Sequence, residues 1–209
     1  MRIATPNEAE MACLPTRIVA LGPEQANANT LCLQPVHQNS HTSAIDLHVG
    51  RMFGNFQTVR KIGEGGMGMV YEARHRQIGR RAAIKIMHKE IAQNAEYATR
   101  FLNEARAVNI IQHRGLVEIS EYGKLDDGTL FIVMEYLQGQ SLRDRISKRK
   151  KSPEGDVTQL AVQLSRALAA AHEKGIIHRD LKPENIMLVP DPVTPEQDWV
   201  KILDFGIAK

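Results

Sequence analysis

The stretch His178-Arg179-Asp180-Leu181-Lys182-Pro183-Glu184-Asn185 decides how this chain is interpreted, and Asp204-Phe205-Gly206 follows it after eighteen further residues. Asp180 and Asn185 place a carboxylate and a carboxamide five positions apart, and Asp204 adds a second carboxylate. Asp180 can accept a hydroxyl proton, and the hard oxygens of Asn185 and Asp204 can bind Mg²⁺. These are the groups that a phosphoryl transfer requires.

Lys182 lies between Asp180 and Asn185, and its cation can neutralise charge on a phosphoryl group during transfer. Taken alone, Asp204 is most simply a turn residue before Gly206. Taken together, the polar residues of both segments have no packing reason to be there. Their agreement therefore favours a catalytic role over a set of unrelated turns.

Upstream, Gly63-Glu64-Gly65-Gly66-Met67-Gly68 fits the pattern G-x-G-x-x-G, with Val70 two positions later. In a dinucleotide-binding fold this pattern would open a helix. Here the residues from Met69 onward predict a strand instead. A glycine loop between two strands can fold over phosphates, because backbone N–H groups approach closely where side chains are missing. An ordinary glycine-rich hairpin explains this segment equally well when it is considered alone.

Lys85 and Glu104 are charged residues in apolar surroundings. Lys85 lies within Ala82-Ala83-Ile84-Lys85-Ile86-Met87, where a lysine is often an edge residue that extends its amine into solvent. Glu104 falls on the apolar stripe of a predicted helix. Because an unpaired buried carboxylate is costly, we expect Lys85 and Glu104 to contact each other at roughly 3–4 Å, leaving the lysine able to hold phosphate oxygens.

Residue periodicity predicts strands followed by helices. The expected strands are 56–61, 69–74, 81–87, 116–123, 130–136, 186–189 and 200–203. The expected helices are 94–112, 141–147 and 156–174. Five strands with one inserted helix, followed by helices, predict two lobes.

Residues 1–55 differ in character from the rest. They show no sustained period, and we expect a flexible N-terminal tail there, with the folded domain starting at residue 56. Cys13, Cys32, His37 and His41 match no compact zinc pattern, so we interpret them as scattered tail residues. With two cysteines in all, the chain has no disulfide framework, which fits a reducing, cytoplasmic setting.

Charge and hydropathy argue against a nucleic-acid-binding, a membrane-spanning or a secreted protein. The net charge of +3 is no polyanion-binding signature, and the basic run 143–151 is most simply a solvated helix end, so we expect no nucleic-acid partner. No apolar run reaches the roughly 18 residues of a spanning helix, so we expect no membrane segment. The start of the chain, broken by Pro15 and Arg17, matches a signal peptide poorly.

In this order, the glycine loop, Ala83-Ile84-Lys85, Glu104, the 178–185 stretch and Asp204-Phe205-Gly206 closely resemble the protein-kinase family over residues 56–209. The lysine at position 182, within Asp-Leu-Lys-Pro-Glu-Asn, resembles the serine/threonine branch of the family. The glycine loop resembles that of bacterial eukaryotic-type serine/threonine kinases. The resemblance implies an α+β, two-lobe fold with a five-stranded antiparallel N-lobe carrying one helix, at about 56–136, and an incomplete helical C-lobe, at about 137–209. It also implies transfer of the ATP γ-phosphate to serine or threonine hydroxyls of a protein substrate.

The resemblance further implies roles by position. The catalytic residues would be Asp180, Lys182, Lys85 and Glu104. Magnesium would be held by Asn185 and Asp204. ATP would be bound by Ile62, Gly63, Glu64, Gly65, Gly66, Met67, Gly68, Met69, Val70, Ala83, Lys85, Met134, Glu135, Leu137 and Met187. Within that set Val70, Ala83 and Met187 would enclose the adenine, Met134 would be the gatekeeper, and the backbone of 135–137 would bond the adenine edge. Val108, His178 and Phe205 would stack in a spine between the lobes.

The chain departs from the family pattern after Asp-Phe-Gly, where an activation segment and further helices are expected. Without them, helix 156–174 would expose an apolar face. We therefore expect residues 1–209 on their own to aggregate or to need a partner, and to show negligible kinase activity. The alternative function is that of a non-catalytic fragment that binds a nucleotide or another protein.

Overall fold

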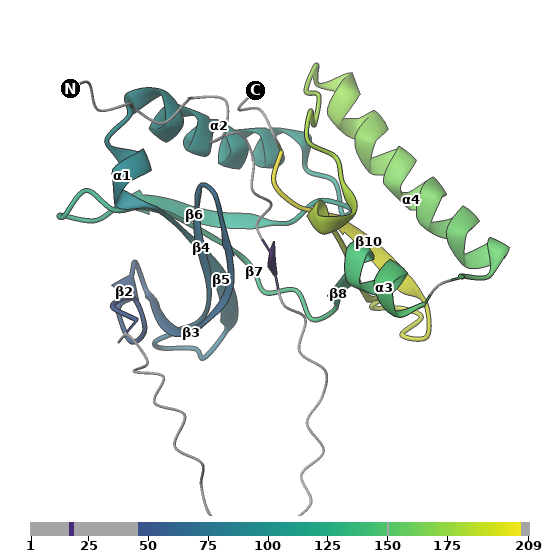
Figure 1. The fold of residues 1–209 in the computed structure, drawn as a ribbon, viewed down its shortest axis with the longest axis horizontal. Helices are drawn as coiled ribbons and strands as arrows, with labels where there is room; N and C mark the ends of the chain where they lie inside the picture. The colour runs from purple at the N-terminus through teal and green to yellow at the C-terminus, as the bar shows by residue number, and fades with distance from the viewer. Residues whose placement is uncertain (1–16, 19–45, 150, 206–209) are drawn as a thin grey trace, which may run out of the picture.

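The computed structural model describes residues 17–18, 46–149 and 151–205. Its N-terminal part is an antiparallel sheet of seven strands in the order β1-β3-β4-β5-β7-β6, with β2 paired to β3 off this path (Figure 1). The strands are β1 (Arg17–Ile18), β2 (Met52–Phe53), β3 (Phe56–Gly65), β4 (Gly68–His75), β5 (Arg81–Met87), β6 (Ile119–Lys124) and β7 (Leu130–Glu135). The five expected strands are confirmed, and two short strands, β1 and β2, extend the sheet.

Two helices are inserted between β5 and β6: α1 (Lys89–Ala92) and α2 (Ala95–Ile111). The side chain of Asn94 starts α2 by accepting the Glu96 N–H at 2.9 Å. The buried face of α2 carries the expected stripe, consisting of Phe101, Glu104, Ala105, Ala107, Val108 and Ile111. This face packs on the sheet and on the second lobe, so α2 carries Glu104 toward the junction between the two lobes (Figure 1).

Residues 46–55, which were expected to be part of a flexible tail, instead contact the sheet, and Met52–Phe53 within them forms β2. Tyr71 is fully buried, and its hydroxyl donates to the Asp46 carboxylate at 2.7 Å. Phe53 is also fully buried, and β2 pairs with the start of β3. A buried phenol requires an acceptor, and this segment supplies it. Of the remaining expected tail, Arg17–Ile18 pairs with Gly63 and Glu64, and the other residues, including Cys13, Cys32, His37 and His41, lie outside the described part.

The second lobe begins after the linker that follows β7. It contains β8 (Gln140–Ser141), α3 (Leu142–Lys148), α4 (Glu154–Glu173), the 3₁₀ turn η1 (Pro183–Asn185), β9 (Ile186–Pro190) and β10 (Asp198–Ile202). Its three strands form a small antiparallel sheet in the order β10-β9-β8, and α4 lies along β10 (Figure 1). The chain leaves α4 through Gly175, whose φ of 70° suits the end of a helix.

The longest helix, α4, is joined to β10 by a polar side chain. Gln163 is buried, accepts the Val200 N–H at 2.8 Å and donates to the Asp198 carbonyl at 3.1 Å. Ala167 and Ala171 are buried, whereas Val157 and Val162 are 53% and 43% exposed. Neither α4 nor any other helix in the described ranges is long and apolar enough to cross a membrane.

Gly139, at the start of the second lobe, offers a direct test of this packing. A Cβ on Gly139 would lie 2.0 Å from the carbonyl oxygen of Leu188, which is backbone and cannot rotate away. We therefore expect Gly139→Ala to separate β8 from β9 and to lower the free energy of unfolding by about 1–3 kcal/mol. Gly155→Ala is the matched control, because a Cβ there meets nothing within 4 Å. Urea denaturation that gives the two variants equal stability would contradict the close approach.

Candidate active site

The loop that precedes η1 brings Asp180, Lys182 and Asn185 together. The Lys182 amine lies 2.7 Å from the Asp180 carboxylate. The Asn185 amide donates to the Asp180 carbonyl at 2.9 Å and to its carboxylate at 3.2 Å. Arg179 has a φ of 62°, in the left-handed region, so the backbone turns sharply just before Asp180. The loop therefore presents an acid and a cation side by side, held by a buried carboxamide.

His178 connects this loop to the segment that carries Asp204. Its Nε2 lies 3.0 Å from the Leu203 carbonyl oxygen, and because that oxygen only accepts, Nε2 is the donor. Burial lowers the pKa of His178, which favours the neutral ring. The His178 ring lies 4.8 Å from the Phe205 ring, and Phe205 shares a buried cluster with Val108. Of the expected spine residues, His178 therefore contacts Phe205, and Phe205 packs in the same cluster as Val108. Gly206 lies outside the described residues.

Lys85 lies between two carboxylates at the junction of the lobes. Its Nζ is 3.3 Å from Glu104 Oε2 and 2.8 Å from Asp204 Oδ1. The expected Lys85–Glu104 contact is confirmed, and the lysine side chain is only 4% exposed, so it is not an edge residue. Burial opposes the charge on Lys85, but the Asp204 and Glu104 carboxylates outweigh it and raise the pKa of the lysine.

Burial raises the pKa of Glu104 to about 7, with a further contribution from the Asp204 charge, while the Lys85 charge opposes the shift. The ordinary pKa of a glutamate is 4.5. Between this pH and about pH 7, Glu104 keeps its proton in the folded chain and releases it in the unfolded chain. By linkage, this group makes stability fall as pH rises through that window.

We expect Glu104→Gln to remove this slope. The free energy of unfolding is measured with denaturant at pH 5, 6, 7 and 8. As pH rises, the wild type should lose stability relative to the variant. Glu96→Gln, on the exposed face of the same helix, is the control and should leave the wild-type slope unchanged. Parallel pH profiles for wild type and Glu104→Gln would contradict the raised pKa.

The glycine-rich segment forms the turn between β3 and β4, where Gly65 pairs with Gly68. It is therefore a hairpin, which agrees both with a phosphate-binding loop between two strands and with an ordinary glycine-rich hairpin. Gly68 has an additional reason to be glycine: a Cβ there would lie 2.1 Å from the Ile86 carbonyl oxygen of β5. His88 also fixes this turn. Its ring contacts the Gly65 carbonyl at 3.2 Å, and its backbone N–H donates to the Met67 carbonyl at 3.2 Å.

The residues expected around an adenine gather in one buried cluster between the lobes. That cluster contains Ile62, Val70, Ala83, Met134, Met187 and Leu203, with Met67 and Leu137 packed against it. Leu203 was not among the expected residues, although its position just before Asp204 was a usable signal. The Glu135 N–H already donates to the Glu118 carbonyl at 2.9 Å. Backbone bonds to an adenine edge would therefore use the Glu135 carbonyl and the Leu137 backbone.

A second group near the linker was also missed. Glu72 is a buried acid on β4 that contacts Arg60 at 2.6 Å and Arg81 at 2.9 Å. Arg81 in turn lies over the Tyr136 ring, 3.9 Å from its centre. An acid among apolar residues of a strand was the available signal, as an acid on the apolar stripe of a helix was for Glu104.

Residues 56–209 match the family model described as the protein kinase domain. The chain belongs to the protein kinase family. The expected recognition and fold class are thereby confirmed. Protein kinases in general use ATP and a divalent metal, and they act on proteins.

Relatives from bacteria share this family. The serine/threonine-protein kinase pkn3 of Myxococcus xanthus is 39% identical over 169 residues, covering 80% of this chain and 30% of that protein. PknF of Mycobacterium tuberculosis is 38% identical over 163 residues, covering 76% of this chain and 33% of that protein. The chain thus spans about a third or less of the length of these curated relatives. The solved PknI kinase domain of Mycobacterium tuberculosis superposes with a TM-score of 0.64 at 29% identity, covering 78% of this chain and 62% of that one.

Proposed function

We propose that this chain carries the ATP site and the catalytic loop of a serine/threonine protein kinase. The observation that supports the proposal best is the convergence of two polar groups at the junction of the lobes. One is the buried lysine between Glu104 and Asp204, and the other is Asp180 with Lys182 and Asn185. His178 links them through the Leu203 carbonyl next to Asp204. These seven charged or polar groups hold one another in place, and together they supply the base, the cations and the oxygen ligands that a phosphoryl transfer requires.

In the proposed reaction, a serine or threonine hydroxyl oxygen of the substrate protein bonds to the γ-phosphorus of ATP. The bond from that phosphorus to the bridging oxygen breaks, and its electron pair remains on ADP. Asp180 takes the hydroxyl proton, and Lys182 at 2.7 Å from it neutralises charge on the transferred group. Lys85, oriented by Glu104, holds phosphate oxygens, and the glycine turn supplies backbone N–H groups.

The donor set at the site fits Mg²⁺. No group of three or more His, Cys, Asp or Glu side chains in the described part of the chain is placed to hold a metal. Mg²⁺ needs no such group, because it takes one or two protein oxygens and completes its shell with phosphates and water. Asn185 and Asp204 would hold it, and the bound ion would neutralise phosphate charge. The Asn185 nitrogen is already bonded to Asp180, which leaves its oxygen as the ligand.

Phosphate transfer from γ-labelled ATP to a generic protein substrate tests this function. The protein should be assayed as residues 1–209 and as a fusion in which the remaining part of a relative's kinase domain follows Lys209. We expect Mg²⁺-dependent labelling of serine or threonine in the fusion. Nucleotide binding without transfer would favour the alternative, a non-catalytic nucleotide-binding segment. The two cysteines and the use of ATP fit a cytoplasmic location.

A further inference from the structure

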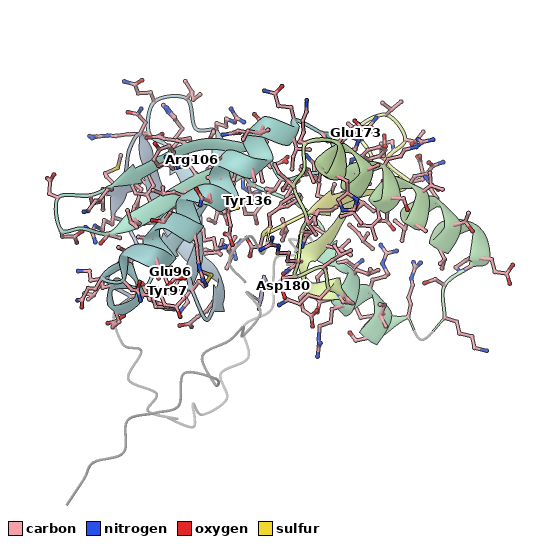
Figure 2. All side chains as sticks on the ribbon, turned by 90° about the horizontal axis from the view of Figure 1, so that it is seen from above. Glu96, Tyr97, Arg106, Tyr136, Glu173 and Asp180 are labelled. Carbon is pink, nitrogen blue, oxygen red and sulfur yellow. The ribbon has the colours of Figure 1, made fainter. Side chains whose placement is uncertain are left out.

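A groove of about 670 Å³ lies against the linker that joins the two lobes. We call it the linker groove and define it by Arg81, Arg114, Tyr136, Val193, Trp199 and Lys201. None of the proposed catalytic or metal-binding residues lines it, but Glu135 and Leu137, whose backbone is proposed to bind the adenine edge, do. Figure 2 marks Tyr136 of the linker and Asp180 of the catalytic loop as separate points at the junction of the lobes. Its volume is in the range of ligand sites, although the proposed phosphoryl transfer gives it no role.

Two arginine–aromatic stacks form the walls of the linker groove. The Arg114 guanidinium lies 3.2 Å above the centre of the Trp199 ring, and the Trp199 N–H donates to the Arg114 carbonyl at 3.3 Å. Arg81 covers the Tyr136 ring and is fixed by Glu72 at 2.9 Å. Stacked guanidinium groups keep N–H donors at their edges, where they can bind carboxylates. Arg81 already uses Nε and Nη2 on Glu72, and Arg114 uses Nη2 on Asp191, so their remaining N–H donors are the ones left for a ligand.

The remaining surface of the groove is apolar. Val193 is 82% exposed at its rim, and the prolines at 190 and 192 flank it. Leu137 and Val189 are half-buried at its base. A ligand that fills the linker groove therefore gains most if it also carries a bulky aliphatic group.

The charge around the groove is positive in excess. Lys201 is paired with Glu135, and Arg114 with Asp191. Glu72, however, is shared by Arg60 and Arg81, which leaves one positive charge uncompensated. Arg74 near the end of β4, and Arg76 and Arg80 in the adjoining β4–β5 turn, are exposed and have no ion pair among the described residues. Arg74 pairs in register with Arg81, so this basic turn continues the rim of the groove.

We propose that the linker groove docks an extended acidic segment of a partner protein, with a bulky aliphatic residue among its glutamates or aspartates. Carboxylates would bind the guanidinium edges and the basic turn, and the aliphatic side chain would cover Val193. The arrangement does not suit a nucleic acid. One face of each aromatic ring is already covered by arginine, so that face is not available for stacking against a base.

The chain contains its own reporter for this proposal, because Trp199 is its only tryptophan. A short synthetic peptide in which glutamates flank a Leu-Pro-Leu core should shift the Trp199 emission saturably, and fluorescence anisotropy of the labelled peptide should give the same affinity. The same peptide with lysines in place of glutamates should bind at least about tenfold more weakly, since like charges then meet across the groove. Added salt should weaken binding of the acidic peptide.

Two sets of variants locate the binding. Arg74→Glu/Arg80→Glu and, separately, Val193→Ser should each weaken the acidic peptide by about tenfold, which corresponds to about 1.4 kcal/mol. All three positions are exposed, so folding should be retained, as circular dichroism can verify. Arg106→Glu, an exposed arginine on α2, is the matched control and should leave the affinity unchanged. The readout is binding, so it is independent of whether the chain transfers phosphate.

Results of three kinds, on charge, on location and on ligand class, would overturn the proposal. The first is equal binding of the acidic and basic peptides. The second is an affinity that neither variant changes, or displacement of the peptide by ATP with Mg²⁺, which would place it in the nucleotide cleft. The third is a single-stranded oligouridylate that competes for the same site with higher affinity, which would assign the groove to nucleic acid.

Discussion

Asp180→Asn should lower phosphate turnover on the order of 10²–10⁴-fold while leaving the affinity for ATP within about twofold. The carboxamide cannot take the hydroxyl proton, but it keeps an oxygen that can accept the Asn185 N–H, so the loop retains that bond. The groups proposed to hold the nucleotide, Lys85 above all, are unchanged in this variant. Turnover is measured by transfer of labelled phosphate in the fusion protein, and ATP affinity by calorimetry.

Asp156→Asn is the matched control, because it removes an exposed acid in the first turn of α4. Its turnover should equal that of the wild type. Equal phosphorylation by wild type and Asp180→Asn would remove Asp180 from its proposed role as the base. A parallel loss of ATP affinity in Asp180→Asn would instead assign it to nucleotide binding.

The sequence was most informative where chemistry constrains individual residues. Glu104 could be paired with Lys85 in advance because a carboxylate on an apolar stripe requires a cation, and few cations lie in apolar strands. The catalytic stretch was equally informative, because no packing requirement explains its composition. In both cases the physical need of one side chain determined where its partner had to be.

Contacts that depend on tertiary pairing could not be predicted. The requirement for glycine at position 139 comes from the Leu188 carbonyl, almost fifty residues away along the chain. Likewise, Asp46 is ordered by the Tyr71 hydroxyl, and nothing in the local composition of residues 46–55 indicates a fold. Segments of this kind are stabilised by contacts with strands far away in sequence, so local propensity underestimates their order.

Lys85→Met should lower the free energy of unfolding by about 3–5 kcal/mol at pH 8, because it leaves Glu104 buried without its cation. At pH 6 the loss should be smaller, since folded Glu104 already carries a proton there and depends less on the lysine charge. Lys61→Met is the control: it breaks a surface pair with Glu64 and should change stability by less than about 1 kcal/mol. Urea denaturation of the chain at both pH values gives all four comparisons.

The double variant Lys85→Met/Glu104→Leu separates the structural role of this pair from its role in phosphate transfer. Replacing a buried ion pair by apolar side chains of similar size is often neutral or stabilising, so the double variant should recover most of the stability that Lys85→Met loses. Asp204 remains, but its side chain is 26% exposed and can be hydrated. Phosphate transfer by the fusion protein should nevertheless stay at the level of Lys85→Met, because Lys85, the cation proposed to hold the phosphate oxygens, is still missing. Transfer that returns together with stability would mean that Lys85 serves the fold and not the reaction.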